Sequence, residues 1–393
     1  MTTVATSNKL FGGSMMSPIV DPYSVYRRLR DEQPVVQVNT MMGVNCMVTR
    51  YDDVVTILKD QSLYSSRANQ RGIGIVMGRT ILEMEGKEHV RFRNIITPFF
   101  SPRAMKGETR RMVEKVINDL IDELARDGKA DLVSQFTFVF PMRVMANIIG
   151  IPVEDHRAFH HMAIDLISVG DDPPRGFAAA QSLLEYLQPI LEKRKVDPTD
   201  DLLSKLVHAE VDGNRLTDEE VLGFLRLLLP AGAETTYRLT GSCLWALLTY
   251  PEVREEVAAD RAKIDLLVEE TLRWESPVQY VSREPTEDVE LSGHPIPAGM
   301  MLSVALGSAN RDERHYADPD RFDLHRKNDD HVGFGFGQHF CAGSFLARVE
   351  ADVALKALLE RLPNLRLDPA EESTIVGLAF RSPNRLPVVF DKD

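Results

Sequence analysis

The segment F-G-F-G-Q-H-F-C-A-G at residues 334–343 is the part of this chain best suited to chemistry. It contains Cys341 and three glycines, a residue type that allows the backbone to take positive φ angles and to approach a flat partner closely. The apolar residues that follow have helical spacing, so the sequence predicts a helix that begins just after Cys341. Because a helix N-terminus carries partial positive charge and free N–H groups, we expect a lowered pKa for the Cys341 thiol.

One thiolate on a glycine-hinged loop suits an axial ligand of haem iron, whereas Cys341 alone leaves open a buried small cysteine before a helix. The flanking residues decide between these two interpretations. The pattern F-G-F-G-x-H-x-C-x-G resembles the haem-binding loop of the cytochrome P450 superfamily. That resemblance implies haem b ligated by Cys341 and contacted by Phe334, Gly335 and Gly343, in a bacterial-type haem-thiolate monooxygenase.

Composition limits the alternatives. With 393 residues, 44% of them hydrophobic, the chain can bury a large core, and a net charge of −13 argues against nucleic acid as a partner. Cys46, Cys243 and Cys341 are odd in number and far apart, which excludes a disulfide framework and a zinc site and favours a reducing cytosol. Residues 1–17 contain one lysine and no long apolar run, so we expect neither a signal peptide nor a membrane anchor. The sequence therefore predicts a soluble, cytoplasmic protein.

Helical periodicity dominates the chain. The predicted helices span Tyr23–Arg30, Tyr51–Lys59, His89–Phe99, Arg111–Arg126, Pro141–Ile149, Glu154–Val169, Ala178–Arg194, Glu219–Leu248, Val253–Trp274 and Phe345–Arg361. Short strand-like runs form two groups, Val35–Val38 with Met47–Thr49, and Val289–Leu291 with Met301–Ala305 and Leu386–Val389. Without a repeat or linker, the strands of both ends must pair or wrap around the helices.

We therefore predict one mainly α domain with a minor β region over residues 21–393, preceded by a flexible segment at residues 1–20. The cytochrome P450 fold has this arrangement, and the resemblance covers the chain from about Asp21 to Val389.

The longest predicted helix carries a second motif. Thr217 and Glu220 form a capping box, and the apolar run that follows predicts a largely buried helix in which Arg226 must reach solvent or find a partner. The run A-G-A-E-T-T at residues 231–236 then places an acid and two hydroxyls inside this helix. A threonine bonded to the preceding turn, with a small glycine opposite, can open a groove beside the helix axis.

Residues 231–235 resemble the family signature A-G-x-(D/E)-T, although a solvent-facing glutamate beside two threonines is the alternative on local sequence. The resemblance implies that Thr235 hydrogen-bonds iron-bound oxygen, that Glu234 relays protons, and that Ala231 and Gly232 border the haem. Cleavage of the O–O bond requires such a proton source. Pro230 departs from the usual pattern, and the sequence leaves open a tolerated kink or a widened groove.

Glu270 and Arg273 lie at i and i+3 on one predicted helix face, a spacing that is also common in weakly stabilising surface pairs. Followed by a Ser-Pro helix stop, they resemble the family's E-x-x-R motif, whose third partner corresponds to Arg321. The resemblance implies that these three residues brace the haem loop.

His89 and Arg93 lie at i and i+4, so that two donors can reach one anion, although a solvated basic face has the same spacing. They resemble the family's H-x-x-x-R, which binds haem propionates. Arg283, after a predicted strand at Pro277–Ser282, and His339 correspond to the other two propionate contacts.

Substrate contacts are expected from mainly aliphatic segments, which favour a compact hydrophobic substrate, with Gln279 and Tyr280 as possible polar anchors. The candidate substrate-binding residues are Ile73, Val76, Leu228, Ala231, Val278, Val281 and Leu378.

The chain contains no flavin or nicotinamide fingerprint, so electrons must come from another protein. The resemblance implies NAD(P)H, an FAD-containing ferredoxin reductase and an iron–sulfur ferredoxin. Arg103, Lys106, Arg110 and Arg111 form a candidate basic docking patch on the thiolate side, with a scattered solvated face as the alternative.

The expected reaction is insertion of one oxygen atom from O2 into a C–H bond of a small-to-medium hydrophobic substrate. A peroxide-driven peroxygenase and a haem-based gas sensor or scaffold are the competing functions. Neither needs the Glu234–Thr235 pair, so its presence disfavours both.

Overall fold

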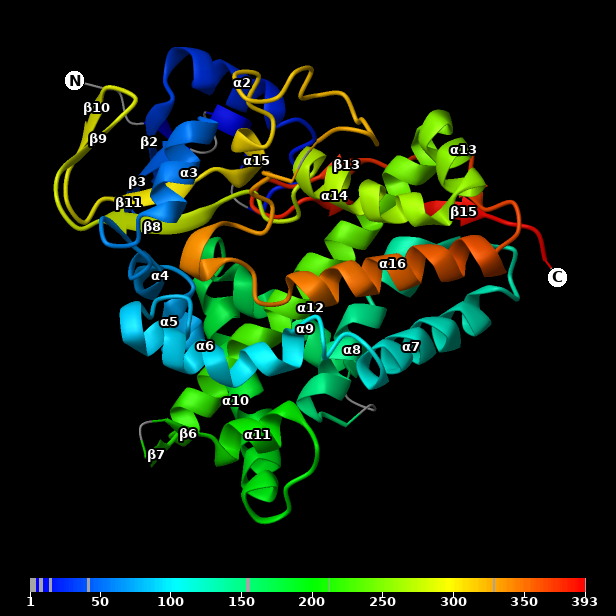
Figure 1. The fold of residues 1–393 in the computed structure, drawn as a ribbon, viewed down its shortest axis with the longest axis horizontal. Helices are drawn as coiled ribbons and strands as arrows, with labels where there is room; N and C mark the ends of the chain where they lie inside the picture. The colour runs from blue at the N-terminus through cyan, green and yellow to red at the C-terminus, as the bar shows by residue number, and fades with distance from the viewer. Residues whose placement is uncertain are drawn as a thin grey trace.

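Helix α12 (Asp218–Thr249) runs through the middle of the molecule, and most of the other helices pack around it (Figure 1). The computed structural model describes residues 5–6, 10–13, 16–40, 43–152, 156–211, 213–327 and 329–392. The predicted capping box is present, because Thr217 Oγ1 accepts from the N–H of Glu220 and the Glu220 carboxylate accepts from the N–H of Thr217. Arg226 finds a partner, since its guanidinium donates to the carbonyl of Met77 (3.2 Å).

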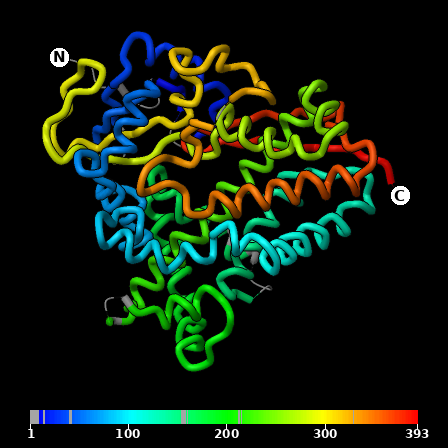
Figure 2. Tube along the Cα trace, viewed as in Figure 1, coloured from blue at the N-terminus to red at the C-terminus, as the bar shows by residue number. Residues whose placement is uncertain are grey.

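The other α-helices lie around α12 or beside the sheet (Figure 1). They are α2 (Tyr23–Glu32), α3 (Tyr51–Lys59), α4 (Ala68–Arg71), α5 (Gly74–Met77), α6 (Gly86–Phe100), α7 (Glu108–Leu124), α8 (Phe140–Ile149), α9 (His156–Ile167), α10 (Pro173–Val196), α11 (Leu202–His208), α13 (Pro251–Ala259), α14 (Ile264–Trp274), α15 (Leu306–Ala309) and α16 (Ser344–Arg361). Helix α16 packs against both α12 and α7, so the segment that enters α16 lies near the centre of the molecule (Figure 2).

Each predicted helix corresponds to an observed one, with one correction. The predicted helix Val253–Trp274 is two helices, α13 and α14, because the chain turns at Asp260, whose carboxylate accepts from the N–H of Ala262 (3.0 Å). The start predicted at Glu154 lies outside the described residues. Helices α4, α5, α11 and α15 were not predicted, since each is too short to show a helical period.

The main sheet joins strands from both ends of the chain. Its order is β1 (Ala5–Thr6), β2 (Val35–Thr40), β3 (Gly43–Val48), β11 (Met301–Val304), β8 (Val281–Pro285) and β4 (Tyr64–Ser65). Strands β3 and β11 pair in parallel, with Asn45 opposite Met301. This pairing confirms that the strands of the two ends meet, and it corrects the predicted division into two groups.

Smaller sheets complete the β region. They are β9 (Val289–Leu291) with β10 (His294–Ile296), β5 (Lys129–Asp131) with β15 (Pro387–Val389) and β12 (Arg366–Leu367), β13 (Ile375–Val376) with β14 (Ser382–Pro383), and β6 (Glu210–Val211) with β7 (Asn214–Arg215). The fold is therefore mainly helical with a minor β region, as the sequence predicts.

The described part of residues 1–20 contacts the rest of the protein. Phe11 is buried against Tyr26, with ring centroids 5.4 Å apart, and the carbonyl of Ile19 accepts from the N–H of Gly377 (2.9 Å). The predicted flexibility of residues 1–20 and the domain boundary at residue 21 stay predictions. In the described part of the chain, no helix combines the length and the apolar character needed to cross a membrane.

Candidate active site

The loop before α16 is closed by its own backbone. The N–H of Cys341 donates to the carbonyl of Phe334 (2.9 Å), which ties the two ends of the loop together. Gly335 and Gly337 have φ angles of 72° and 73°. A Cβ on Gly337 would lie only 2.5 Å from the carbonyl oxygen of Leu58. Conformation and close approach therefore both require glycine at residue 337, as the loop pattern predicts.

The prediction of a low pKa for the Cys341 thiol is wrong when only the groups of the protein itself act on the thiol. Cys341 lies inside the protein at the cavity wall, and desolvation there raises the pKa of its thiol. The N–H of Gly343 and the charges of Arg93 and Arg348 lower that pKa, but burial outweighs them. The thiolate therefore needs further positive charge, which a metal ion supplies, because a coordinating thiol is deprotonated.

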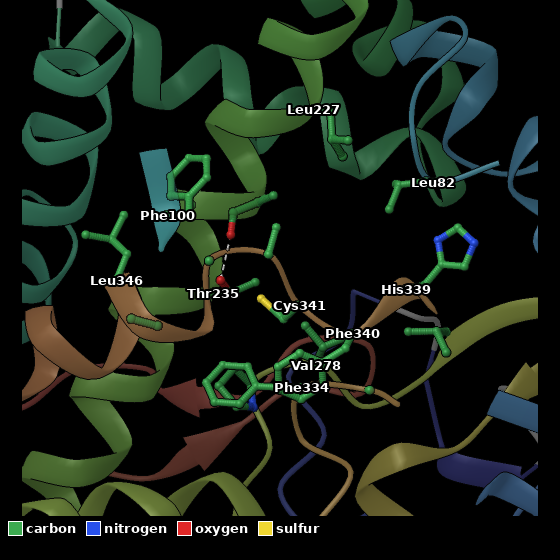
Figure 3. Close-up of a pocket in the computed structure, with 18 of the residues that line it drawn as sticks. Leu82, Phe100, Leu227, Thr235, Val278, Phe334, His339, Phe340, Cys341 and Leu346 are labelled. Carbon is green, nitrogen blue, oxygen red and sulfur yellow. Dashed lines mark hydrogen bonds between the residues drawn. The ribbon is translucent and has the colours of Figure 1, made fainter. Parts of the chain in front are cut away.

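A cavity of about 280 Å³ lies between this loop and α12 (Figure 3). Cys341, Phe334 and Phe340 contribute to it from the loop, and Thr235 contributes from α12. The other walls are mainly aliphatic and include Ile81, Leu82, Ile96, Leu227, Leu239, Leu306 and Leu346. The cavity is therefore apolar except near the threonines of α12 and near a group of histidines and arginines.

Thr235 and Glu234 have different surroundings although they are adjacent. The Thr235 hydroxyl lines the cavity and donates to the carbonyl of Ala231 (2.7 Å), the predicted bond to the preceding turn (Figure 3). The Glu234 side chain is 2% exposed and lies 3.1 Å from the guanidinium of Arg238, which also donates to Ser382 Oγ (3.2 Å). A solvent-facing Glu234 is therefore excluded, and the carboxylate is held in a buried ion pair beside the cavity.

Gly232 allows α8 to approach α12 closely. A Cβ on Gly232 would lie 2.5 Å from the sulfur of Met145, and both residues line the cavity. The expected space opposite the threonine is thus partly filled by a thioether from α8. Pro230 is buried within α12, which continues on both sides of it, and the choice between a tolerated kink and a widened groove stays open.

His89 and His339 meet at one end of the cavity, with ring centroids 4.3 Å apart. Neither ring nitrogen of His89 nor Nε2 of His339 has a hydrogen-bond partner. Burial, followed by the charge of Arg93, lowers the pKa of His89 to about 4, and burial, followed by the charge of Arg283, lowers that of His339 to about 3. His89 is fully buried, so a solvated basic face is excluded.

The two arginines complete this cluster. Arg93 lines the cavity and donates to the carbonyl of Phe340, and Arg283 lies within β8, a strand that begins later than the predicted Pro277–Ser282. Burial lowers the pKa of Arg283 to about 10. Buried, unsatisfied donors beside two guanidinium groups fit the two carboxylates of a haem, with Cys341 in the same cavity as its ligand.

Glu270 and Arg273 form a fully buried ion pair with two hydrogen bonds of 2.7 and 2.8 Å. The predicted third partner is wrong. Arg321 has an exposed side chain and offers only its carbonyl to Arg273 (3.3 Å), whereas Arg326 Nε lies 3.4 Å from the Glu270 carboxylate. A turn in which the N–H of Arg326 donates to the carbonyl of Asp323 brings the later arginine back over Glu270.

A second ion-pair cluster, which sequence analysis missed, lies beside Phe334. Arg348 donates to both carboxylate oxygens of Glu269 (2.5 and 2.9 Å), and its guanidinium carbon lies 4.6 Å from the Phe334 ring centroid. His331 Nε2 lies 3.1 Å from the same carboxylate. The three groups come from α14, from α16 and from the segment just before the cysteine loop, so no spacing within one element indicated that they meet.

Sequence analysis also missed a carboxyl group on α16. Glu350 is fully buried, and burial raises its pKa well above the usual range, although the neighbouring Thr236 hydroxyl acts to lower it. Thr236 lines the cavity. Sequence analysis placed Glu350 only within the predicted helix Phe345–Arg361, with no role assigned to it. Glu350 is thus a buried acid next to a cavity-lining hydroxyl.

The candidate substrate residues are only partly brought together. Leu228, Ala231, Val278 and Val281 line the cavity. Ile73, Val76 and Leu378 are not among its lining residues, because the first two pack with the main core and Leu378 packs in the core beneath the sheet. Gln279 is fully buried and donates to the carbonyl of Ser276 (2.8 Å), so it braces its own turn rather than the cavity.

Only part of the predicted basic patch is exposed and free to contact a partner protein. Arg103, Lys106 and Arg111 are exposed. Arg110 is half-buried between Glu114 (2.9 Å) and Asp352 (3.1 Å), so its charge is already compensated within the protein. The patch on this face therefore consists of three exposed cations.

Apolar side chains surround the cysteine loop on the protein surface. Phe336 and Phe345, which do not line the cavity, are 42% and 44% exposed, and Lys59 lies over the Phe336 ring at 5.1 Å from its centroid. Scattered surface apolar residues are ordinary, but here one exposed phenylalanine precedes Cys341 and another follows it within ten residues of chain. The surface nearest Cys341 is therefore partly apolar.

Comparisons with known proteins agree with this geometry. Residues 175–375 match the family model "Cytochrome P450". The chain is 35% identical to cytochrome P450 107B1 of Saccharopolyspora erythraea, over 94% of this chain and 95% of the relative. It is 35% identical to vitamin D(3) 25-hydroxylase of Pseudonocardia autotrophica, over 98% and 97% of the two chains. The myxobacterial cytochrome P450 CYP267B1 in complex with myristic acid has a TM-score of 0.87 at 32% identity, over 95% and 97% of the two chains.

Proposed function

The chain belongs to the cytochrome P450 family of haem-thiolate monooxygenases, and from this we propose that it hydroxylates a small-to-medium hydrophobic organic substrate with one oxygen atom of O2. The observation that carries the proposal is the cavity itself. It brings together a single thiol, a threonine hydroxyl on the central helix and four cationic or histidine donors, of which His89 and Arg283 are buried, with aliphatic walls between them. The cofactor of this family, haem b, supplies the oxygen-activating chemistry when bound.

The haem contacts are assigned to the residues that fit them. Cys341 is the proposed axial ligand, and His89, Arg93, Arg283 and His339 are the proposed donors to the propionates. The unsatisfied ring nitrogens of the two histidines support this assignment, because buried donors cost stability unless they find acceptors. The remaining proposed contacts are Phe334, Gly335, Gly343, Ala231 and Gly232, all of which line the cavity.

Proton delivery is assigned to Thr235 and Glu234. The hydroxyl of Thr235 accepts and passes on protons at the cavity wall, where its bond to Ala231 fixes its position. Glu234 lies behind that wall, paired with Arg238, and brings protons to Thr235 when its carboxylate turns away from the guanidinium. We expect Thr235→Ala to keep substrate affinity and NADH consumption but to divert electrons to hydrogen peroxide. A Thr235→Ala variant that couples NADH to product as tightly as wild type would refute this role.

The substrate is assigned to the apolar part of the cavity. Leu82, Leu227, Leu228, Val278 and Val281 supply aliphatic walls, so shape and apolar contact select the ligand. One similar protein is named for hydroxylation of vitamin D(3) and another was solved with myristic acid. We therefore test steroids, secosteroids, fatty acids, small terpenoids and aromatics by the optical shift that displacement of iron-bound water produces.

Electrons are proposed to come from NAD(P)H through an FAD-containing ferredoxin reductase and an iron–sulfur ferredoxin. The docking surface combines the exposed cations Arg103, Lys106 and Arg111 with the exposed phenylalanines beside the cysteine loop, Phe336 and Phe345. We expect Lys106→Glu with Arg111→Glu to slow reduction by a ferredoxin at low salt and to flatten the salt dependence of that rate. Substrate affinity serves as the control and should not change. Unchanged reduction kinetics at low salt would place the docking contact elsewhere.

One experiment separates this function from its competitors. The purified haem protein is supplied with NADH, a ferredoxin and its reductase, and with hydrogen peroxide in parallel. We expect product only with the electron-transfer proteins, together with the red-shifted Soret band of a thiolate-ligated, CO-bound haem, which Cys341→Ser should lose. Product with peroxide alone would indicate a peroxygenase, and no product under either condition would favour a sensor or scaffold.

A cytoplasmic location stays part of the proposal. All three cysteines, Cys46, Cys243 and Cys341, are free thiols in the structure, as expected in a reducing compartment.

A further inference from the structure

We propose that Arg348 is a positioning residue that raises the reduction potential of the haem, and that Glu269 limits this effect by compensating the arginine's charge. The proposal rests on the assignment of Cys341 as the axial ligand. It concerns two side chains that do not reach the cavity and that the E-x-x-R motif does not include.

The geometry places Arg348 directly behind the cysteine loop. Its guanidinium lies over the Phe334 ring, at 4.6 Å from the ring centroid, and Phe334 accepts the N–H of Cys341 through its carbonyl. Nη1 of Arg348 also donates to the carbonyl of Ser344, at the start of α16 (3.3 Å). The guanidinium therefore bridges both ends of the short segment that holds the sulfur.

Glu269 fixes this guanidinium from α14. The pair has two hydrogen bonds, of 2.5 and 2.9 Å, and the side chains are 33% and 27% exposed. His331 contacts the same carboxylate (3.1 Å), and its Nδ1 accepts the N–H of Gly333, immediately before the loop. A planar, two-bond pair orients an arginine more firmly than a single contact would.

Electrostatics give the direction of the effect. Reduction of ferric to ferrous haem adds one electron from the donor protein and makes the site more negative by one charge. A fixed positive charge near the sulfur therefore favours the reduced state, and a fixed negative charge opposes it. The charge of Arg348 acts on Cys341 through the protein interior, in the direction that stabilises negative charge on the sulfur.

Substitutions of the two partners of the ion pair should therefore shift the reduction potential in opposite directions. Arg348→Gln removes the cation and should lower the reduction potential. Glu269→Gln leaves the cation uncompensated and should raise it. A purely structural role would give shifts of the same sign, because each substitution breaks the same pair and loosens the same loop. The sign of the shift therefore separates an electrostatic role from a structural one.

The experiment measures the potential of the haem-loaded protein by spectroelectrochemistry with small mediators and without a partner protein. Arg348→Lys keeps the charge and loses the two-bond geometry, so it should stay closer to wild type than Arg348→Gln. Asp352→Asn is the matched control, since it removes an anion paired with Arg110 one helical turn further along α16. Its shift should be smaller than that of Glu269→Gln.

Opposite shifts for Arg348→Gln and Glu269→Gln, both larger than that of Asp352→Asn, support the proposal. Shifts of the same sign, or shifts no larger than the control, overturn it. If Arg348→Gln does not retain haem, the reduction potential of Glu269→Gln alone is the test. An unchanged or lowered potential in Glu269→Gln then overturns the proposal. Failure of the underlying assignment is distinguishable, because the wild-type protein would then lack the thiolate-type Soret band of the reduced, CO-bound state.

Discussion

Replacing Arg326 should destabilise the protein far more than replacing Arg321, although both arginines lie in one short segment beside Glu270. Arg326 is 10% exposed, and its guanidinium contacts the Glu270 carboxylate and donates to the carbonyls of Ala317 (2.6 Å) and Asp318 (3.0 Å). Arg321 has an exposed side chain, and only its carbonyl takes part in the cluster.

The size of the effect follows from these contacts. A hydrogen bond from a charged donor contributes about 1.5–3 kcal/mol, and removing one partner of a buried ion pair costs about 3–5 kcal/mol. The contact of Arg326 with Glu270 is long, at 3.4 Å, and Arg273 still compensates the carboxylate. We therefore expect Arg326→Gln to cost about 2–4 kcal/mol of unfolding free energy. Arg321→Gln should stay within about 0.5 kcal/mol of wild type, as surface substitutions do.

Urea unfolding of the haem-loaded protein, followed by circular dichroism, measures both variants. A double-mutant cycle with Glu270→Gln should give a coupling energy of about 0.5–3 kcal/mol for Arg326 and none for Arg321. Equal destabilisation by the two substitutions, or coupling of Glu270 to Arg321 instead, would refute the assignment of the third partner.

Three further predictions concern the loop, the central helix and pH. Gly337→Ala should lower haem retention and cost about 1–3 kcal/mol, because the new Cβ meets a backbone carbonyl at positive φ, whereas Gly170→Ala, at a site with open space, should change neither. Pro230→Ala should stabilise α12 by up to ~3 kcal/mol in local helix propensity, and an altered product distribution would show that the proline shapes the cavity. Although burial raises the pKa of Glu269, hydrogen bonds from its partners lower it to about 2, below the ordinary 4.5, so its stabilising effect is present above pH 4.5 and lost as pH falls towards 2. Glu269→Gln should accordingly destabilise the protein more at pH 5 than at pH 3.5 in urea unfolding.

Sequence reasoning succeeded where the residues that act together lie close together in the sequence. The cysteine loop depends on glycines whose conformation and clearance are local properties, and the structure has both. Glu270 and Arg273 lie on one helix face, so a spacing of three residues was enough to predict their contact. The sequence also predicted that strands from the two ends pair or wrap around the helices, and the pairing of β3 with β11 is the first of these outcomes.

Contacts between distant segments were not predictable in the same way. Whether Arg321 or Arg326 reaches Glu270 depends on a turn that no hydrophobic period reveals. The pairing of Glu269 with Arg348 depends on how α14 packs against α16. For the same reason Ile73, Val76 and Leu378 were assigned to a cavity that they do not line, because burial in a core and burial beside a ligand produce the same apolar sequence.

The Glu234–Thr235 motif identifies two candidate functional side chains but does not predict their different surroundings. Adjacent residues on an α-helix point about 100° apart, and of this pair only Thr235 lines the cavity. Thr235 shares its face with Ala231, at i−4, and both line the cavity. Glu234 shares its face with Arg238, at i+4, and the two form a buried pair behind that wall. The motif thus identifies a hydroxyl inside the cavity and an acid outside it, and only packing around Arg238 determines that the acid is shielded from solvent.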